Sequence, residues 1–138
     1  MTPGLRKAYL QTAYVVRAPQ GVHALRIGTC HPAFDAELSE AGASCWAFLT
    51  AWNPGSLPRS VEQNALAQAE LLRVVEELGL VSWPAEGKAD AGGWREESVC
   101  VLDLEATGAV ALGRRFGQVA VVFGQVGEAA RLLAVSQA

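Results

Sequence analysis

The hydrophobic pattern of the first third of the chain predicts a β-hairpin and a short helix. Residues 9–18 are rich in aromatic and β-branched side chains, which favours a strand. The Ala-Pro-Gln-Gly segment at 18–21 fits a type I turn, and residues 23–28 alternate polar and apolar as a second strand does. Pro32 then favours the first turn of a helix, which Gly42 ends.

The middle of the chain predicts a buried strand followed by the longest helix. Residues 45–52 are apolar at successive positions, as in a strand covered on both faces, and the Asn-Pro-Gly-Ser segment at 53–56 ends that strand. Ser60 and Gln63 form a capping box that begins a helix over 61–78. The apolar stripe expected on its buried face consists of Val61, Ala65, Leu72 and Val75.

The last third of the chain predicts three further strands and one more helix after a short strand. Residues 80–83 form the short strand, which Pro84 interrupts, and residues 86–93 are rich in glycine and alanine, which is typical of a flexible hairpin loop. The pattern then predicts a strand over 94–104, a helix over 105–116, a buried strand over 119–126 and an edge strand over 131–135.

The predicted fold is therefore a single α+β domain spanning residues 1–138, with residues 1–8 as an N-terminal tail. The order of elements is ββαβαββαββ, which indicates a mixed, mostly antiparallel sheet packed by three helices. A length of 138 residues is typical of one domain with a sizeable core.

Composition narrows the functional class without assigning a reaction. Hydrophobic residues make up 51% of the chain and charged residues 18%, which argues against disorder. Eleven basic residues against 14 acidic ones give a net charge of −3, so we expect neither a nucleic-acid partner nor attraction to a membrane surface. The N-terminus does not resemble a secretory signal, and no apolar run in the sequence is long enough to span a membrane. We therefore expect a cytoplasmic protein.

The spacing of the cysteines and the absence of common catalytic motifs give no indication of a metal or a cofactor. Cys45 and Cys100 lie in apolar runs, where a small buried thiol is the ordinary interpretation. Cys30 is followed by His31, but a structural zinc site needs four ligands in paired spacings. Phosphate-binding loops, dinucleotide-binding glycine motifs, nucleophile elbows and zinc-protease helices are absent from the sequence, so whether the protein is an enzyme stays open.

Polar residues at the end of the central strand form the first part of a candidate ligand site. Thr50 and Asn53 follow the strand, where ligands bind in many sheets covered by helices. Arg59 precedes the N-terminus of the long helix, whose free N–H groups favour anions, and Asn64 lies one turn into it. The structural alternatives are ordinary turn chemistry at Asn53 and bracing of its loop by Asn64.

The second part of the candidate site lies on two later strands. Glu96 and Glu97 are neighbours on a strand and therefore face opposite sides, so at most one of them faces a shared pocket. Ser98 follows them, and Gln118 begins a strand of buried residues, where its amide requires hydrogen bonds. The alternatives are solvated carboxylates and a backbone hydrogen bond from Gln118.

Two of the four tryptophans flank these polar residues. Trp52 and Trp94 are candidates to stack on a planar ligand, with core packing as the alternative, whereas Trp46 is expected in the core. The candidate ligand-binding residues are Thr50, Trp52, Asn53, Arg59, Asn64, Trp94, Glu96, Glu97, Ser98 and Gln118.

Three segments together resemble the bacterial family known as domain of unknown function 3293. They are Tyr9-x-x-Thr12-x-Tyr14, Thr50-Ala51-Trp52-Asn53-Pro54 followed by Asn64, and Trp94-x-Glu96-Glu97-Ser98 with Phe116-Gly117-Gln118-x-Ala120. The resemblance extends over residues 9–133, and its most specific part is the segment at 50–54. It implies a small bacterial cytoplasmic protein whose polar signature is Thr12, Asn53, Asn64, Glu96, Glu97, Ser98 and Gln118, and it implies no established activity, cofactor or partner.

Two functional hypotheses follow. In the first, the domain binds a small polar, phosphorylated or nucleotide-like ligand at a pocket near Asn53, Asn64, Glu96 and Gln118, and a glutamate is the general base if catalysis occurs. In the second, it is a non-catalytic interaction module that pairs with itself or another chain through the C-terminal edge strand, because exposed edges favour pairing. Formation of a homodimer stays open.

Overall fold

The computed structural model describes residues 1–135, which form a seven-stranded sheet and four α-helices. The strand order is β2-β1-β4-β5-β3-β6-β7, and every neighbouring pair is antiparallel. The elements in chain order are α1 (Pro3–Leu10), β1 (Thr12–Ala18), β2 (Gly21–Leu25), α2 (Pro32–Glu40), β3 (Cys45–Leu49), the 3-10 turn η1 (Pro54–Ser56), α3 (Val61–Glu77), β4 (Ser82–Ala89), β5 (Arg95–Leu102), α4 (Ala106–Arg115), β6 (Ala120–Gln125) and β7 (Arg131–Ala134).

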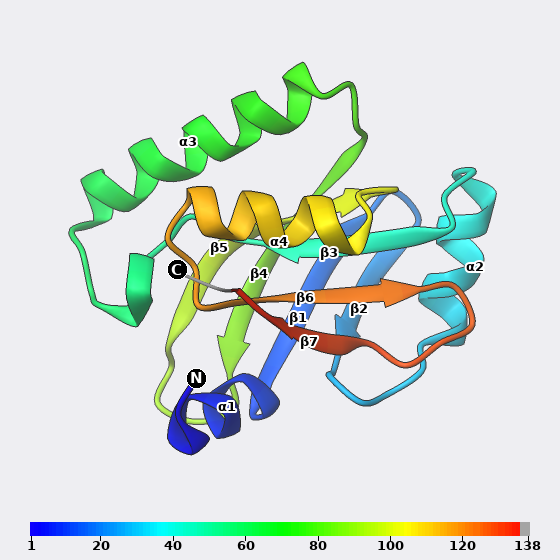
Figure 1. Cartoon of the computed structure of the whole chain (residues 1–138). Helices are drawn as coiled ribbons and strands as arrows, with labels where there is room; N and C mark the ends of the chain where they lie inside the picture. The colour runs from blue at the N-terminus through cyan, green and yellow to red at the C-terminus, as the bar shows by residue number, and fades with distance from the viewer. Residues whose placement is uncertain (136–138) are drawn as a thin grey trace.

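The sheet curls strongly, so that β1 and β2 run across the direction of β6 and β7 (Figure 1). The segment after β2 reaches the residue before β7, since Gly28 N–H donates to Ala130 O at 2.7 Å and Ala130 N–H donates to Thr29 O at 3.1 Å. The curl gives the sheet an inner face, which it encloses, and an outer face, which α3 and α4 cover.

The outer face is packed mainly by aliphatic residues, together with Phe123. Alternate residues of β3, β5 and β6 point outward and meet α3 and α4 in one hydrophobic cluster. The stripe of α3 that reaches this cluster differs from the one expected from sequence: Asn64, Gln68, Leu71, Val74 and Val75 are buried. Val61, Ala65 and Leu72 are exposed, so that expectation was wrong for three of its four residues. The buried stripe includes two amides, which a count of apolar positions does not detect.

The inner face is packed by aromatic residues and is closed at one end by α2. Phe34 of α2 is 1% exposed and lies 5.6 Å from the Trp46 ring and 6.1 Å from the Trp83 ring. Gly124 of β6 leaves room for this packing, because a Cβ there would lie 2.5 Å from the Trp46 indole. The expectation that Trp46 belongs to the core is confirmed, and Cys45 and Cys100 are buried thiols as expected.

The α+β class is confirmed, and four details of the expected fold are corrected. The segment expected as an N-terminal tail forms α1, because Thr2 caps Leu5 N–H and a proline follows it at the first helical position. There are consequently four helices, and no parallel strand pair is present within residues 1–135. The loop expected over 86–93 is shorter, since β4 continues through Pro84 to Ala89 and pairs with β1 on one side and β5 on the other.

The edges of the sheet are β2 and β7, which confirms the expected C-terminal edge strand. In the part of the chain that the structure describes, no helix is long and apolar enough to cross a bilayer.

Candidate functional site

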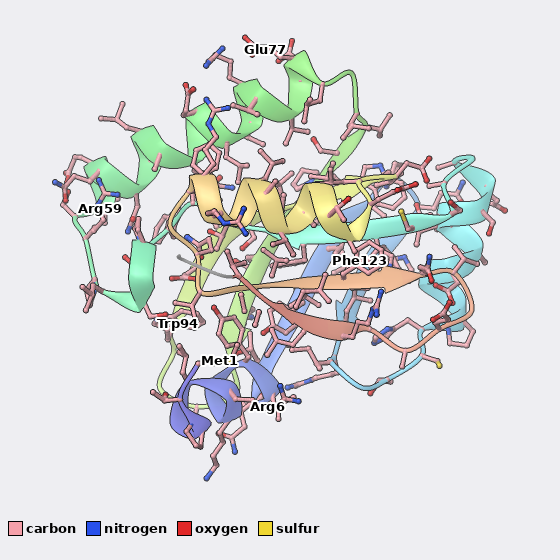
Figure 2. The ribbon with its side chains drawn as sticks, in the orientation of Figure 1. Met1, Arg6, Arg59, Glu77, Trp94 and Phe123 are labelled. Carbon is pink, nitrogen blue, oxygen red and sulfur yellow. The ribbon has the colours of Figure 1, made fainter. Side chains whose placement is uncertain are left out.

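A pocket of about 540 Å³ opens on the inner face, at the end of the curled sheet opposite α2. Its walls come from α1, the strands β1, β3, β4, β5 and β6, and the loop that contains η1. Figure 2 shows Trp94 in the region between this loop and α1. Five aromatic residues belong to the lining, namely Tyr9, Tyr14, Phe48, Trp52 and Trp94. We refer to this cavity as the inner pocket.

Glu96 is one of the carboxyl groups in the wall of the inner pocket, and β5 directs it inward. Its Oε2 accepts a hydrogen bond of 2.9 Å from Asn53 Nδ2. Burial raises the pKa of Glu96 from 4.5 to about 7, and the hydrogen bond from Asn53 opposes this rise. Near neutral pH the group therefore exists in both protonation states. Since Oε2 accepts from Asn53, the proton of the neutral form resides on Oε1.

Asn53 is fixed by its own loop so that its amide NH₂ points at Glu96. It adopts a left-handed backbone conformation with φ of 47°, and its N–H donates to Asn64 Oδ1 at 2.9 Å. Its side-chain oxygen accepts from Arg59 N–H at 3.0 Å and from Asn64 Nδ2 at 2.9 Å. Because the oxygen is held by two donors, the amide cannot reverse its orientation. Asn64, 2% exposed, thus braces the loop from α3.

The same loop is held against the turn between α4 and β6. Gly55 N–H donates to Gly117 O at 2.7 Å, and Gly117 has a φ of +71°. A Cβ on Gly117 would lie 2.8 Å from Pro54 Cβ, so only glycine permits this approach. Gln118 Nε2 donates to Trp52 O at 3.0 Å and to Phe116 O at 3.3 Å. The backbone contact expected for Gln118 is therefore present, and the residue positions the pocket wall.

Thr50 and Ser98 also line the inner pocket and likewise bind the backbone. Thr50 Oγ1 donates to Glu97 O at 2.7 Å and accepts from Trp52 N–H at 3.1 Å. Ser98 Oγ donates to Glu96 O at 3.1 Å. The Thr50 hydroxyl therefore joins the end of β3 to β5, whereas the Ser98 hydroxyl binds within β5 beside Glu96. Glu96 differs from these neighbours, because within residues 1–135 its Oε1 has no hydrogen-bond partner.

Of the ten residues that the sequence suggested as ligand-binding, some line the inner pocket and the others lie outside it. Seven line the inner pocket: Thr50, Trp52, Asn53, Trp94, Glu96, Ser98 and Gln118. Asn64 lies behind Asn53, and Arg59 is exposed at the start of α3, where Figure 2 shows it at the outer end of the helix. Glu97 faces the outer side of the sheet, as strand alternation requires.

Sequence reasoning missed the contribution of α1. Leu5, Ala8 and Tyr9 of this helix line the inner pocket. Burial and the negative charge of Glu96 raise the pKa of Tyr9, whereas a backbone hydrogen bond at Ala120 lowers it, so the phenol stays protonated at neutral pH. The helix could have been found from Thr2 and Pro3, which together form an ordinary helix start.

The charges around the inner pocket are acidic. Asp90 and Glu96 line it, and none of its lining residues, all within 1–135, is a lysine or arginine. Asp90 forms an ion pair of 2.8 Å with Arg26, which lowers the pKa of Asp90. No group of three or more potential metal-ligating side chains lies together in the described part of the chain. The arrangement suits a ligand that carries a basic nitrogen rather than a phosphate.

Comparison with known proteins gives one match. A family model described as "Protein of unknown function (DUF3293)" matches residues 49–121, which include the Asn53 loop, α3, β4, β5 and α4. No curated protein matches the chain, and no solved structure matches it.

Proposed function

Because the chain belongs to the DUF3293 family, whose description names no activity, we propose its function from the geometry of the inner pocket. The domain binds a small organic base there, such as an amine or a nitrogen heterocycle. Glu96 is the polar anchor and the aromatic walls hold the apolar part of the ligand.

The observation that supports this proposal is the position of Glu96 in a cavity with aromatic walls: the other carboxyl group of the lining, Asp90, is paired with Arg26, whereas no ion pair to Glu96 is present within residues 1–135. The amides and hydroxyls beside Glu96 bind the protein itself, whereas Glu96 Oε1 faces the pocket. A volume of about 540 Å³ is in the ordinary range of small-molecule sites. Aromatic faces attract cations, and a carboxyl group forms a charge-assisted hydrogen bond with a protonated nitrogen.

The proton on Glu96 determines how the pocket responds to pH. With a pKa of about 7, the carboxyl group accepts a proton from, or donates one to, a ligand nitrogen at physiological pH. A cationic ligand binds the ionised form, so its affinity rises as the pH increases through 7. The same proton exchange is what a general acid or base performs, and that is the role we propose for Glu96 if the bound molecule reacts.

The sequence alone left a phosphorylated ligand open, and we do not include it in the proposal. The lining residues carry two carboxyl groups and no basic side chain to balance a phosphate. Arg59 was expected to supply that positive charge, but it is exposed and does not line the pocket. A nucleobase or nucleoside stays within the proposed class, whereas a nucleotide requires its phosphate to extend out of the pocket.

The test compares Glu96→Gln with Glu97→Gln, a neighbouring pair on opposite faces of β5. Purified protein is screened by thermal shift against amines, nitrogen heterocycles and their phosphorylated counterparts. We expect at least one unphosphorylated base to bind, to perturb the Trp94 indole signal in NMR spectra, and to bind at least about tenfold more weakly to Glu96→Gln. Glu97→Gln should bind as the wild type does. Hits confined to phosphorylated compounds, or equal losses in both variants, would overturn the proposal.

The second hypothesis, self-association, rests on β7. This strand is an edge of the sheet and is four residues long, with Leu132 and Leu133 half-buried. We propose it as the alternative function, in which β7 pairs with β7 of a second copy. Light scattering over a range of concentrations tests it, and a strict monomer at the highest concentration removes it. The bacterial origin and cytoplasmic location that the resemblance implies are likewise proposals.

A further inference from the structure

A second cavity, of about 550 Å³, lies on the outer face of the sheet. It is bounded by Gln68 and Leu72 of α3 and by residues of β1, β4 and β5, with Trp52 at one side. In Figure 1, α3 spans this side of the sheet above α4. We refer to this cavity as the outer pocket. It is separate from the inner pocket, although Trp52 and Ser98 contribute to both walls.

Two residues that line the outer pocket each carry a buried hydrogen-bond donor without a partner within residues 1–135. Gln68 is 2% exposed, and its Oε1 accepts from Ala51 N–H at 2.9 Å. That bond fixes the orientation of the amide, so the donor Nε2 is the atom left over. Within residues 1–135, Gln68 Nε2 and Trp52 Nε1 are the buried side-chain nitrogen or oxygen atoms that lack a hydrogen-bond partner.

An unpaired buried donor is costly, because it has lost its hydrogen bonds to water and gains none in return. Here the two donors belong to Gln68 of α3 and to Trp52, which follows β3 by three positions, and both residues line one cavity. A single water occupies about 30 Å³, so a cavity of about 550 Å³ has room for a molecule of several carbon atoms as well. Leu72, Pro84 and Val99 supply apolar surface beside the donors.

The charges around the outer pocket balance one another. Glu86 is 7% exposed and lies between Arg17 Nη2 at 3.1 Å and Arg95 Nε at 3.4 Å. Glu97 is the second carboxylate in the lining, so two arginines face two glutamates. With no net charge to attract an ion, the two neutral donors select a neutral acceptor.

We propose that the outer pocket is a second ligand site, which takes a small uncharged molecule carrying a carbonyl oxygen, such as an amide or lactam. The carbonyl oxygen accepts hydrogen bonds from Gln68 Nε2 and Trp52 Nε1, and the hydrocarbon part of the ligand packs on Leu72 and Val99. This site is independent of the base-binding function of the inner pocket.

The experiment uses two six-membered rings that differ in the relevant group, δ-valerolactam and piperidine. Each is titrated into the ¹⁵N-labelled protein while three side-chain signals are followed in NMR spectra. Gln68 NH₂ reports the outer pocket, the Trp94 indole reports the inner pocket, and the Trp52 indole borders both. We expect the lactam to shift Gln68 and Trp52 and to leave Trp94 unchanged, and piperidine not to shift Gln68.

Two variants separate binding from folding. Gln68→Met keeps the length of the side chain and removes the free donor, so we expect at least about tenfold weaker lactam binding. Because this variant also removes the acceptor of Ala51 N–H, Leu72→Trp is the second variant, since Leu72 is 42% exposed and a larger ring there fills the pocket. Glu96→Gln is the control and should bind the lactam normally.

Unchanged Gln68 and Trp52 signals up to the solubility limit of the lactam would overturn the proposal. Lactam binding that survives in Leu72→Trp would overturn it as well, because the molecule would then bind elsewhere. Loss of lactam binding in Glu96→Gln would assign the lactam to the inner pocket and contradict a second site. Failure of the inner pocket to bind any base leaves these results unaffected, so the two proposals fail separately.

Discussion

On the inner face of the sheet, Asn53 forms hydrogen bonds through both ends of its side-chain amide, whereas on the outer face Gln68 keeps a buried NH₂ group without a partner. The two regions meet at the end of β3. Asn64 and Gln68 lie one turn apart on α3, and their side-chain oxygens accept hydrogen bonds from the backbone N–H groups of Asn53 and Ala51. One row of amides on α3 thus holds the exit of β3 in place.

The difference shows how a polar residue is assigned to structure or to binding. The side-chain hydrogen bonds of Asn53 and Asn64 hold the loop together, so neither amide is available to a ligand. The group available to a ligand at this end of the inner face is the Glu96 carboxyl. Gln68 performs its structural task with its oxygen alone, and its nitrogen is the group available to a ligand. Counting the hydrogen bonds of each atom, rather than of each residue, separates the two roles.

Phe34→Ala tests whether the inner face depends on its aromatic packing, and it has the largest expected effect. The side chain is 1% exposed and contacts the rings of His23, Trp46 and Trp83. We expect the free energy of unfolding to fall by about 3–5 kcal/mol, measured by denaturant titration. Phe34→Leu should recover much of the loss. A loss below about 1 kcal/mol in Phe34→Ala would mean that α2 does not close the inner core.

Asn64→Ala removes the hydrogen bonds between α3 and Asn53 and leaves the bond between Gln68 and Ala51 N–H in place. It removes two hydrogen bonds to Asn53 and leaves a backbone N–H without its acceptor, so we expect a loss of about 2–3 kcal/mol. The Trp94 indole signal should shift and the Gln68 signal should not. Asn64→Asp keeps the acceptor for Asn53 N–H and serves as the milder variant. Equal shifts on both sides would show that α3 moves as a whole.

The raised pKa of Glu96 predicts that the free energy of unfolding depends on pH. The pKa of Glu96 is 4.5 for the ordinary group and about 7 in the folded protein, so between these values the native state holds a proton that the unfolded chain has lost. Glu96 therefore favours folding most at about pH 4.5 and below, and this contribution disappears as the pH rises through 7.

We expect this dependence to amount to about 1–3 kcal/mol between pH 4.5 and pH 8, and to vanish in Glu96→Gln. The measurement is denaturant unfolding of the wild type, Glu96→Gln and Glu97→Gln at several pH values. Glu97→Gln should follow the wild type, because Glu97 lies exposed on the opposite face. A wild type whose stability instead rises over this interval relative to Glu96→Gln would contradict the raised pKa.

The smallest effect is expected on the exposed side of α3. Leu66 is 74% exposed, and Leu66→Ala should change the free energy of unfolding by no more than about 0.5 kcal/mol. Leu71 is 1% exposed, and Leu71→Ala should cost about 2–5 kcal/mol by the same denaturant measurement. Similar losses in both variants would mean that the outer side of α3 is covered in solution.

Much of the fold could be predicted from sequence because it rests on local chemistry. The Ser60 and Gln63 side chains form a capping box that begins α3, and the apolar run of β3 is buried at every residue. The buried face of α3 could not be predicted from hydrophobicity, because Asn64 and Gln68 occupy it and Leu66 does not. Their burial depends on backbone partners, Asn53 and Ala51, which precede them by 11 and 17 residues, beyond the range of helix periodicity.

The candidate site was predicted in part for the same reason. Strand alternation places Glu96 and Glu97 on opposite faces, but it does not say which face encloses a cavity. Tyr9 and Leu5 join the inner pocket because α1 covers the open end of the curled sheet, and curling depends on the whole strand order. No residue near α1 in sequence indicates that contact.

The sequence by itself determined the α+β class, the helix and strand chemistry, and the set of polar residues around Asn53. Only the tertiary structure decided that Glu96 faces an aromatic cavity while Gln68 faces a second one. The physical reason is that short-range propensities act within a few residues of the chain. The environment of a buried carboxyl or amide is set by strands and helices that the curl of the sheet brings together from opposite ends of the sequence.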